Sequence, residues 1–304
     1  MRILSILGPT AVGKSALVSS LLEKNQNLSF ISCDSRKVYR YMDIGTAKPP
    51  LSLRRNFSLI DIRDPDETYS AQDFARDAER IIEEKLKEGK IPIVVGGTAL
   101  YYRALFIGLF EAPPLDPDIR KRILEELKIK GSAYLHQKLM KIDEETARKL
   151  HPNDWIRITR ALEVYEQTGI PVSVLRREKK IKPKFNPLYV GIIRRREELY
   201  ERINKRVEYM ISSGLIEETK KILDMGYSPD LPSLNTIGYR EIILYLKEQI
   251  CFDNAIRIIK KRTRIYARKQ LYFFRHLGLI KWSPAEDEDL AQRVLSLVNE
   301  LYEK

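Results

Sequence analysis

The chain has few residues of the kinds that form disulfides or bind transition metals, with two cysteines and three histidines among 304 residues. Cys33 and Cys251 are far apart in sequence, so they offer neither a disulfide framework nor the close spacing of a metal-binding motif. The histidines are scattered, which favours surface or capping roles over metal ligation. This cysteine usage suits the reducing cytosol, and we expect a cytoplasmic protein.

Long hydrophobic runs are also missing. No apolar segment approaches the roughly 20 residues that span a bilayer. The short one at residues 3–7 is interrupted by Gly8-Pro9 and followed by Lys14, unlike a signal peptide. No repeat, low-complexity segment or obvious coiled coil is present, so we expect no membrane contact and a monomer. The 43% of apolar residues suffices for the core of one large domain or two moderate ones.

Acidic residues are absent from residues 254–282, which contain nine lysines and arginines. If this stretch is helical through Phe274, its apolar residues share one face and its cations line an adjacent one. A solvated amphipathic helix is the plain alternative, but the complete lack of acids favours a phosphate-binding face. Because the whole chain carries 54 Lys and Arg against 42 Asp and Glu, the preferred partner is a nucleic acid.

The first hundred residues alternate between strand and helix signals. Apolar runs at residues 2–7, 28–33, 57–61 and 91–97 are separated by helical patterns, one of them from Lys14 to Lys24. Another helix is bounded by Ser70, which can cap it with Asp73 three residues later, and by Gly89, which ends it. The pattern predicts an α/β fold built on a parallel sheet flanked by helices.

Strand signals vanish between residues 116 and 184. Helical periodicity remains there, with turns predicted at Gly131-Ser132, His151-Pro152-Asn153 and Gly169-Ile170-Pro171. This segment is basic, with 17 Lys and Arg against 11 Asp and Glu. The run PLYVGIIRR, residues 187–195, then returns the chain to the sheet, and helices are expected to complete the rest. We therefore predict a core of residues 1–115 and 185–304 with an inserted all-helical domain of residues 116–184.

A GxxxxGKS pattern follows the first predicted strand directly and opens the helix after it. Its residues are Gly8, Pro9, Thr10, Ala11, Val12, Gly13, Lys14 and Ser15. In this context the pattern predicts a phosphate-binding loop and a P-loop NTPase-like fold, because the glycines let backbone N–H groups converge on phosphate oxygens. Lys14 can reach the distal phosphate and Ser15 can hold Mg²⁺. The motif alone does not say which bond breaks.

Asp34 and Ser35 follow the second predicted strand, where strand ends lie beside the phosphate-binding loop. An aspartate in this place can bind the metal, cap a turn or act as a general base. Its position alone leaves these three roles open.

Six further segments carry a resemblance to a known family. They are DSRKVYRYMDIGTAKP, YSAQDF, PIVVGGTALYYRAL, HPNDWIRITRALEVYEQTG, NTIGYREI and YARKQLYFFR. With these segments the chain resembles the tRNA dimethylallyltransferases, also called tRNA isopentenyltransferases, and without a C-terminal zinc finger it resembles the bacterial members. The resemblance implies transfer of a dimethylallyl group from dimethylallyl diphosphate to the N6 amine of the adenosine immediately 3′ of the anticodon in tRNA. The phosphate-binding loop would then hold a diphosphate leaving group.

The resemblance also implies roles for single residues. Thr10 would contact the bridging region of the diphosphate, and Lys14 and Ser15 the phosphates and Mg²⁺. Arg206 would reach in from a later helix, and Asp34 would accept the proton of the adenine amine. A turn hydroxyl is the alternative for Thr10 and a surface cation for Arg206.

Contacts to the anticodon stem-loop are implied for loops around the site, with the inserted domain gripping one side of the RNA. The residues are Asp34, Ser35, Arg36, Lys37, Thr98, Arg120, Ile156, Arg157, Ile158, Thr159, Arg160, Asn235, Thr236, Ile237, Gly238, Tyr239 and Arg240. Each has a structural alternative, such as a helix cap for Thr98, intrahelical pairs for Arg157 and Arg160, and a turn for Gly238. Asn235 departs from the residue usual in the family, which concerns RNA contact and leaves the diphosphate site intact.

Three other functions fit parts of the sequence. A small-molecule or nucleoside kinase would use ATP in the same loop. An isopentenyltransferase acting on free adenine nucleotides would share the loop and Asp34, but it would have little use for the basic insert and the acid-free helix. A non-catalytic RNA-binding protein with a nucleotide switch would not need Asp34.

Overall fold

The computed structural model of the protein describes residues 1–110, 112–179 and 181–302. The chain divides into two compact units, Met1–Phe106 with Pro183–Lys304, and Ile107–Lys182. Each unit has a hydrophobic core of its own. Over the described ranges, every helix is too short or too polar to cross a membrane.

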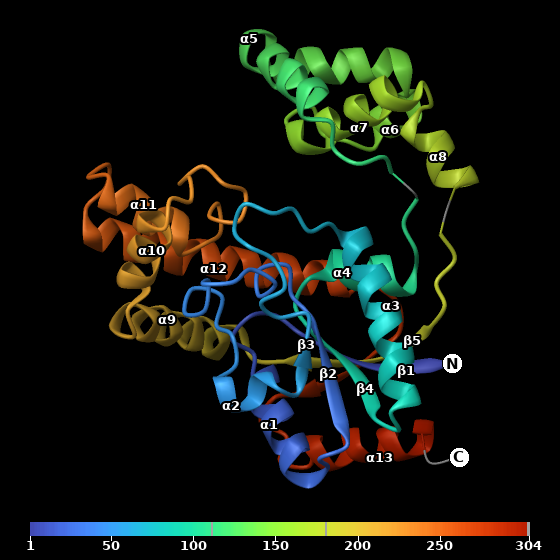
Figure 1. The fold of residues 1–304 in the computed structure, drawn as a ribbon, viewed down its shortest axis with the longest axis vertical. Helices are drawn as coiled ribbons and strands as arrows, with labels where there is room; N and C mark the ends of the chain where they lie inside the picture. The colour runs from blue at the N-terminus through green and yellow to red at the C-terminus, as the bar shows by residue number, and fades with distance from the viewer. Residues whose placement is uncertain (111, 180, 303–304) are drawn as a thin grey trace. The chain divides into compact units, whose positions relative to one another are not determined.

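The first unit is built on a six-stranded parallel sheet with the order β3-β2-β4-β1-β5-β6, of which Figure 1 labels β1 to β5. Its strands are β1 (Arg2–Leu7), β2 (Leu28–Cys33), β3 (Phe57–Ser58), β4 (Ile91–Gly96), β5 (Asn186–Ile193) and β6 (Ile280–Pro284). This confirms the predicted parallel sheet flanked by helices.

Two cores cover the two faces of the sheet, as the alternation of side chains along β1 requires. Leu4 and Ile6 face α1 (Lys14–Lys24) and α13 (Leu290–Tyr302). Ile3 and Leu7 face α3 (Ala71–Lys87) and α4 (Ala99–Phe106). The predicted cap of α3 is confirmed, because Ser70 and Asp73 exchange side chain to backbone hydrogen bonds.

Residues 280–284 correct the expectation that only helices follow β5. They form β6, an edge strand parallel to β5, and its Trp282 packs so tightly on Gly191 that a Cβ there would lie 2.4 Å from the indole ring. The partner strand therefore determines this element, which the short and partly polar sequence IKWSP does not reveal. The predicted strand at residues 57–61 is likewise shorter, since only Phe57–Ser58 pair in the sheet.

Helices α9 (Arg196–Ser212), α10 (Leu215–Asp224), α11 (Tyr239–Leu246) and α12 (Phe252–Phe274) enclose a third core beside the sheet. The partly buried Leu53 of α2 (Leu51–Arg54) packs instead against the core that α1 and α13 share. The basic stretch is helical through Phe274 as predicted, and Ile259, Ala267 and Gln270 are among its buried residues. The short α2 contributes no buried residue to a core.

The second unit is formed by α5 (Pro117–Ile142), α6 (Glu144–Arg148), α7 (Trp155–Thr168) and α8 (Val172–Glu178). The backbone departs from helical geometry at Gly131 within α5, and Gly169 ends α7 in the left-handed conformation. The sequence predicts turns at both positions, and the positive φ of each glycine confirms them.

Asp143 links two helix N-termini in the second unit. Its buried carboxylate accepts hydrogen bonds from the backbone N–H groups of Thr146 (3.0 Å) in α6 and Ser173 (2.9 Å) in α8. Burial alone would raise the pKa of this carboxyl, but the bonds from Ser173 and Thr146 hold the pKa below its ordinary value. Because the folded-state pKa is the lower one, the carboxylate stabilises the fold above about pH 4, and this stabilisation is lost as the pH falls through the folded-state pKa.

We expect Asp143→Asn to lower the free energy of unfolding of the second unit by about 1–3 kcal/mol at pH 7, because the amide keeps one acceptor and turns a donor toward a buried N–H group. Its acid-dependent loss of stability should be smaller than that of the wild type. Hydrogen exchange on the full chain measures both effects. Asp154→Asn is the control, since Asp154 accepts one backbone bond, from Arg157 (3.3 Å). Equal effects of the two variants would contradict the prediction.

Candidate functional site

A cavity of about 560 Å³ lies in the first unit, lined by the loops that follow the strands. The phosphate-binding loop follows β1, Asp34 follows β2, and Gly97 follows β4. Because the carboxyl ends of parallel strands share one edge of the sheet, these loops meet there. Gly96, at the end of β4, lets the end of β2 lie directly against it, since a Cβ on Gly96 would lie 2.0 Å from the Cys33 carbonyl oxygen. Arg206 and residues 235–238 line the same cavity.

The phosphate-binding loop, residues 8–15, connects the end of β1 to the start of α1. Ala11 and Gly13 have positive φ angles of 63° and 125°, and α1 starts directly afterwards. The ammonium of Lys14 donates to the carbonyl oxygens of Gly8 (2.7 Å) and Pro9 (2.8 Å). The loop therefore presents a helix N-terminus and a cation to the cavity, an arrangement that favours an anion.

Three cations converge on the cavity. Burial, followed by the charges of Lys37 and Arg206, lowers the pKa of Lys14 to about 7. Burial also lowers the pKa values of Lys37 and Arg206. Arg206 donates to the Thr10 hydroxyl at 3.3 Å. Within the part of the chain that the structure describes, none of the three is ion-paired with a carboxylate, so a bound anion would relieve their repulsion.

Side chains distant in sequence hold the phosphate-binding loop in place. Arg202 donates to the Ala11 carbonyl (3.0 Å) and Arg194 to the Val12 carbonyl (2.8 Å). The buried amide of Gln270 accepts from the Thr10 backbone N–H (2.9 Å) and donates to the Gly97 carbonyl (2.8 Å). Sequence reasoning missed these roles. For Gln270 the available signal was a polar amide on the apolar face of a predicted helix.

Asp34 caps a turn and also lines the cavity. Its carboxylate accepts a hydrogen bond from the Arg36 backbone N–H at 2.9 Å and remains half-buried. The Thr98 hydroxyl accepts from the Ser35 backbone N–H at 3.0 Å, which ties this loop to the end of β4. The structure therefore shows that Asp34 caps a turn. Because its carboxylate also lines the cavity, it can still contact a bound substrate.

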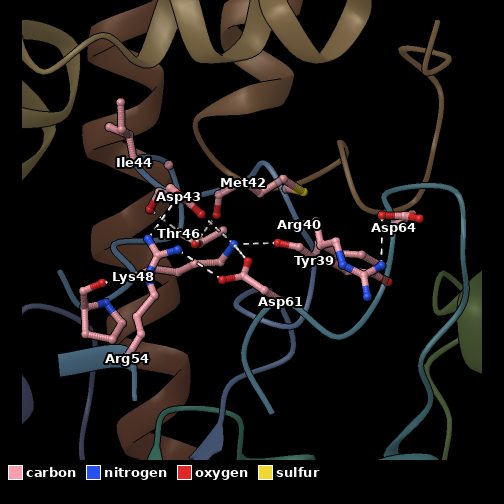
Figure 2. Close-up of polar contacts among 12 residues, drawn as sticks. Tyr39, Arg40, Met42, Asp43, Ile44, Thr46, Lys48, Arg54, Asp61 and Asp64 are labelled. Atoms are coloured by element: carbon pink, nitrogen blue, oxygen red, sulfur yellow. Dashed lines mark hydrogen bonds and ion pairs between the residues drawn. The ribbon is translucent and has the colours of Figure 1, made fainter. Parts of the chain in front are cut away.

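Residues 43–50, here called the wall loop, form another side of the cavity through Gly45, Thr46, Ala47, Pro49 and Pro50. Behind the wall loop, the fully buried ammonium of Lys48 contacts Asp43 (2.7 Å), Asp61 (2.5 Å) and the Tyr39 carbonyl (2.6 Å). Arg54 contacts the same two carboxylates at 3.0 Å each. Figure 2 shows the resulting closed ring of two cations and two carboxylates. The buried charge of Lys48 is therefore paired, as burial requires, while Asp43 and Asp61 remain partly exposed.

The predicted RNA contacts differ in accessibility. The side chains of Ile158, Thr159 and Tyr239 are buried, and those of Ile158 and Tyr239 pack in hydrophobic cores. RNA contact at these three positions stays a prediction. Gly238 has a φ of 102° and is the N-cap residue that precedes α11, a backbone conformation that fits the turn alternative. Exposed Asn235 and Arg240 are hydrogen-bonded to each other at 3.2 Å.

The predicted contacts in the second unit already have partners. Arg120 and Arg160 both pair with the buried Glu163, and Arg157 pairs with Asp154. Ile156 is 60% exposed. The intrahelical alternatives for Arg157 and Arg160 are therefore present, although each cation remains at least partly accessible.

The residues around the cavity do not form a protein cage for a metal. Among the described residues, no group of three or more His, Cys, Asp or Glu side chains could hold an ion. Ser15 lies at the start of α1 and lines the cavity. One hydroxyl next to a phosphate site fits Mg²⁺, which is commonly held by one or two protein ligands, water and substrate phosphates.

Comparison with known proteins identifies similar chains over nearly the full length. Residues 37–277 match the family model described as IPP transferase. The tRNA dimethylallyltransferase of Thermotoga petrophila is 46% identical over 96% of this chain and 95% of its own length, and that of Carboxydothermus hydrogenoformans is 45% identical over 98% and 97%.

Two solved structures are also similar. The tRNA isopentenylpyrophosphate transferase of Bacillus halodurans has a TM-score of 0.68 and 36% identity, covering 99% of this chain and 95% of that one. A eukaryotic dimethylallyltransferase acting on tRNA has a TM-score of 0.82 and 29% identity, covering 99% of this chain and 79% of that one.

Proposed function

The chain belongs to the tRNA dimethylallyltransferase family, and from that premise we propose that it transfers a dimethylallyl group from dimethylallyl diphosphate to the N6 amine of the adenosine immediately 3′ of the anticodon in tRNA, releasing diphosphate. One observation carries the assignment of the site. The phosphate-binding loop and the cations Lys14, Lys37 and Arg206, which form no ion pair with a carboxylate among the described residues, share a 560 Å³ cavity with the half-buried carboxylate of Asp34.

The leaving diphosphate is assigned to the phosphate-binding loop. Cleavage of the allylic C–O bond leaves negative charge on the diphosphate and positive charge on the isoprenoid. The backbone N–H groups at the start of α1, the ammonium of Lys14 and the guanidinium of Arg206 stabilise that negative charge, and Thr10 orients Arg206. Ser15 would hold Mg²⁺, which would supply further neutralisation of the diphosphate charge.

We assign to Asp34 the role of accepting the proton that the adenine amine loses. The lone pair of an adenine amine is delocalised into the ring, so a carboxylate that accepts a proton as the C–N bond forms helps the reaction. The target base must leave its stack to reach the cavity. We assign binding of the RNA backbone to the predicted contact residues of the second unit and to the basic face of α12. Contacts to phosphates fix the position of the RNA.

The comparisons favour this function over a kinase and over a transferase acting on free nucleotides. One experiment separates them all. The protein and Mg²⁺ are incubated with labelled dimethylallyl diphosphate or labelled ATP, and with unmodified tRNA or AMP as the acceptor. We expect label from dimethylallyl diphosphate on tRNA alone and no turnover of ATP. Label on AMP, or ATP hydrolysis without transfer to tRNA, would overturn the proposal.

A further inference from the structure

Glu218 on α10 joins two of the loops that line the cavity without lining it itself. Its carboxylate accepts hydrogen bonds from three successive backbone N–H groups of the wall loop, those of Asp43 (2.9 Å), Ile44 (2.8 Å) and Gly45 (3.1 Å). It also accepts a bond from the Tyr239 hydroxyl at 2.6 Å. Successive N–H groups around one anion form a nest, and such charge-assisted bonds are stronger than neutral ones.

The two loops touch where Glu218 holds them. A Cβ added to Gly45 would lie 2.4 Å from the Tyr239 ring, so the wall loop rests directly on that side chain. Tyr239 directly follows the residues 235–238 that line the cavity. Its ring is fully buried, so the contact is fixed by packing as well as by the hydroxyl bond.

The wall loop itself is stiff. The Lys48 backbone N–H donates to the Asp43 carbonyl at 3.1 Å, and the Thr46 hydroxyl donates to the Met42 carbonyl at 2.6 Å. The ring of Lys48, Arg54, Asp43 and Asp61 fixes the other side of the loop (Figure 2). A shift at Glu218 therefore displaces the segment as a unit rather than being absorbed within it.

We propose that Glu218 is a positioning residue for the transfer reaction, which sets the separation between the wall loop and residues 235–238 in the cavity. This inference rests on the proposed function. A catalytic geometry that is misplaced by about 1 Å can lose about a hundredfold in rate, so a carboxylate outside the cavity can control the reaction within it. The phosphate-binding loop has its own supports in Arg194, Arg202 and Gln270, so diphosphate binding should not depend on Glu218.

The test compares Glu218→Gln with Glu217→Gln, a matched loss of charge on the neighbouring, exposed glutamate of the same helix turn. The amide keeps the length of Glu218 but can no longer accept all four bonds. We expect Glu218→Gln to lower the single-turnover rate and kcat/KM for tRNA at least about tenfold. The Kd for inorganic diphosphate with Mg²⁺ should stay within about twofold of the wild type, as for independent sites. Glu217→Gln should match the wild type in both measurements.

Tyr239→Phe provides a second, milder variant that keeps the buried ring and removes one donor. We expect a rate reduction of about two- to tenfold, and less than a multiplicative effect when it is combined with Glu218→Gln, because both changes remove the same bond. If the wild type transfers the dimethylallyl group to tRNA and Glu218→Gln does so at the same rate, the proposed role of Glu218 is wrong. It is also wrong if Glu218→Gln loses transfer rate and diphosphate affinity to the same extent. Absence of transfer by the wild type would instead refute the proposed function.

Discussion

Asp34→Asn is expected to slow the transfer of the dimethylallyl group to bound tRNA at least about a hundredfold, since general bases contribute about a hundredfold to ten-thousandfold. The amide oxygen can still accept the hydrogen bond from the Arg36 backbone N–H, so the turn that Asp34 caps is retained. What the substitution removes is the capacity to take a proton from the adenine amine. Single-turnover kinetics with enzyme in excess over labelled tRNA measure the chemical step directly.

The affinity of Asp34→Asn for tRNA should remain within a few-fold, because size and loop geometry are preserved. Asp34→Ala removes the turn cap as well as the carboxylate and is the matched comparison. We expect it to bind tRNA more weakly than Asp34→Asn while its chemical step is similarly slow. If Asp34→Asn shows normal single-turnover kinetics, Asp34 is the turn cap seen in the structure and another group accepts the proton.

The parts of the fold that the sequence predicts are those encoded by neighbouring residues. The first strand, the phosphate-binding loop and the helix from Lys14 to Lys24 follow from one apolar run, two glycines and one helical pattern. The cap of α3 depends on two residues three positions apart, and the turns at Gly131 and Gly169 on the freedom of single glycines. In each of these cases the physical cause lies within a few residues.

The parts that could not be predicted depend on partners distant in the chain. β6 is a strand because β5 offers a free edge and a glycine beneath Trp282, about ninety residues away. Gln270 supports a loop at Thr10, and Glu218 contacts the backbone at Gly45. Nothing in the local sequence distinguishes Glu218 from the adjacent Glu217. Only the folded chain shows that one faces a nest of N–H groups while the other is exposed.

Lys14→Met is expected to reduce the single-turnover rate about a hundredfold to a thousandfold, because removal of one donor to a developing anion has an effect of this size. It should also weaken binding of inorganic diphosphate at least about tenfold, since a hydrogen bond to a charged group contributes about 1.5–3 kcal/mol. The affinity for tRNA should be nearly unchanged. Equilibrium titration with diphosphate and Mg²⁺, alongside the transfer assay, measures these effects.

The same variant should lose little stability, which separates the loss of function from misfolding. Burial and the charges of Lys37 and Arg206 lower the pKa of Lys14 to about 7, so its protonated form destabilises the fold, and this penalty is relieved only as the pH rises from about 7 toward the unfolded value near 10.5. Methionine removes the penalty together with two hydrogen bonds to carbonyls, so we expect the melting temperature at pH 7 to stay within about 3 °C of the wild type. Lys24→Met, at the exposed end of the same helix, is the charge-matched control and should leave diphosphate binding and transfer unchanged. Unaltered diphosphate affinity in Lys14→Met would contradict the role of Lys14 in binding the diphosphate, and it would leave the backbone N–H groups and Arg206 as the groups that hold the anion.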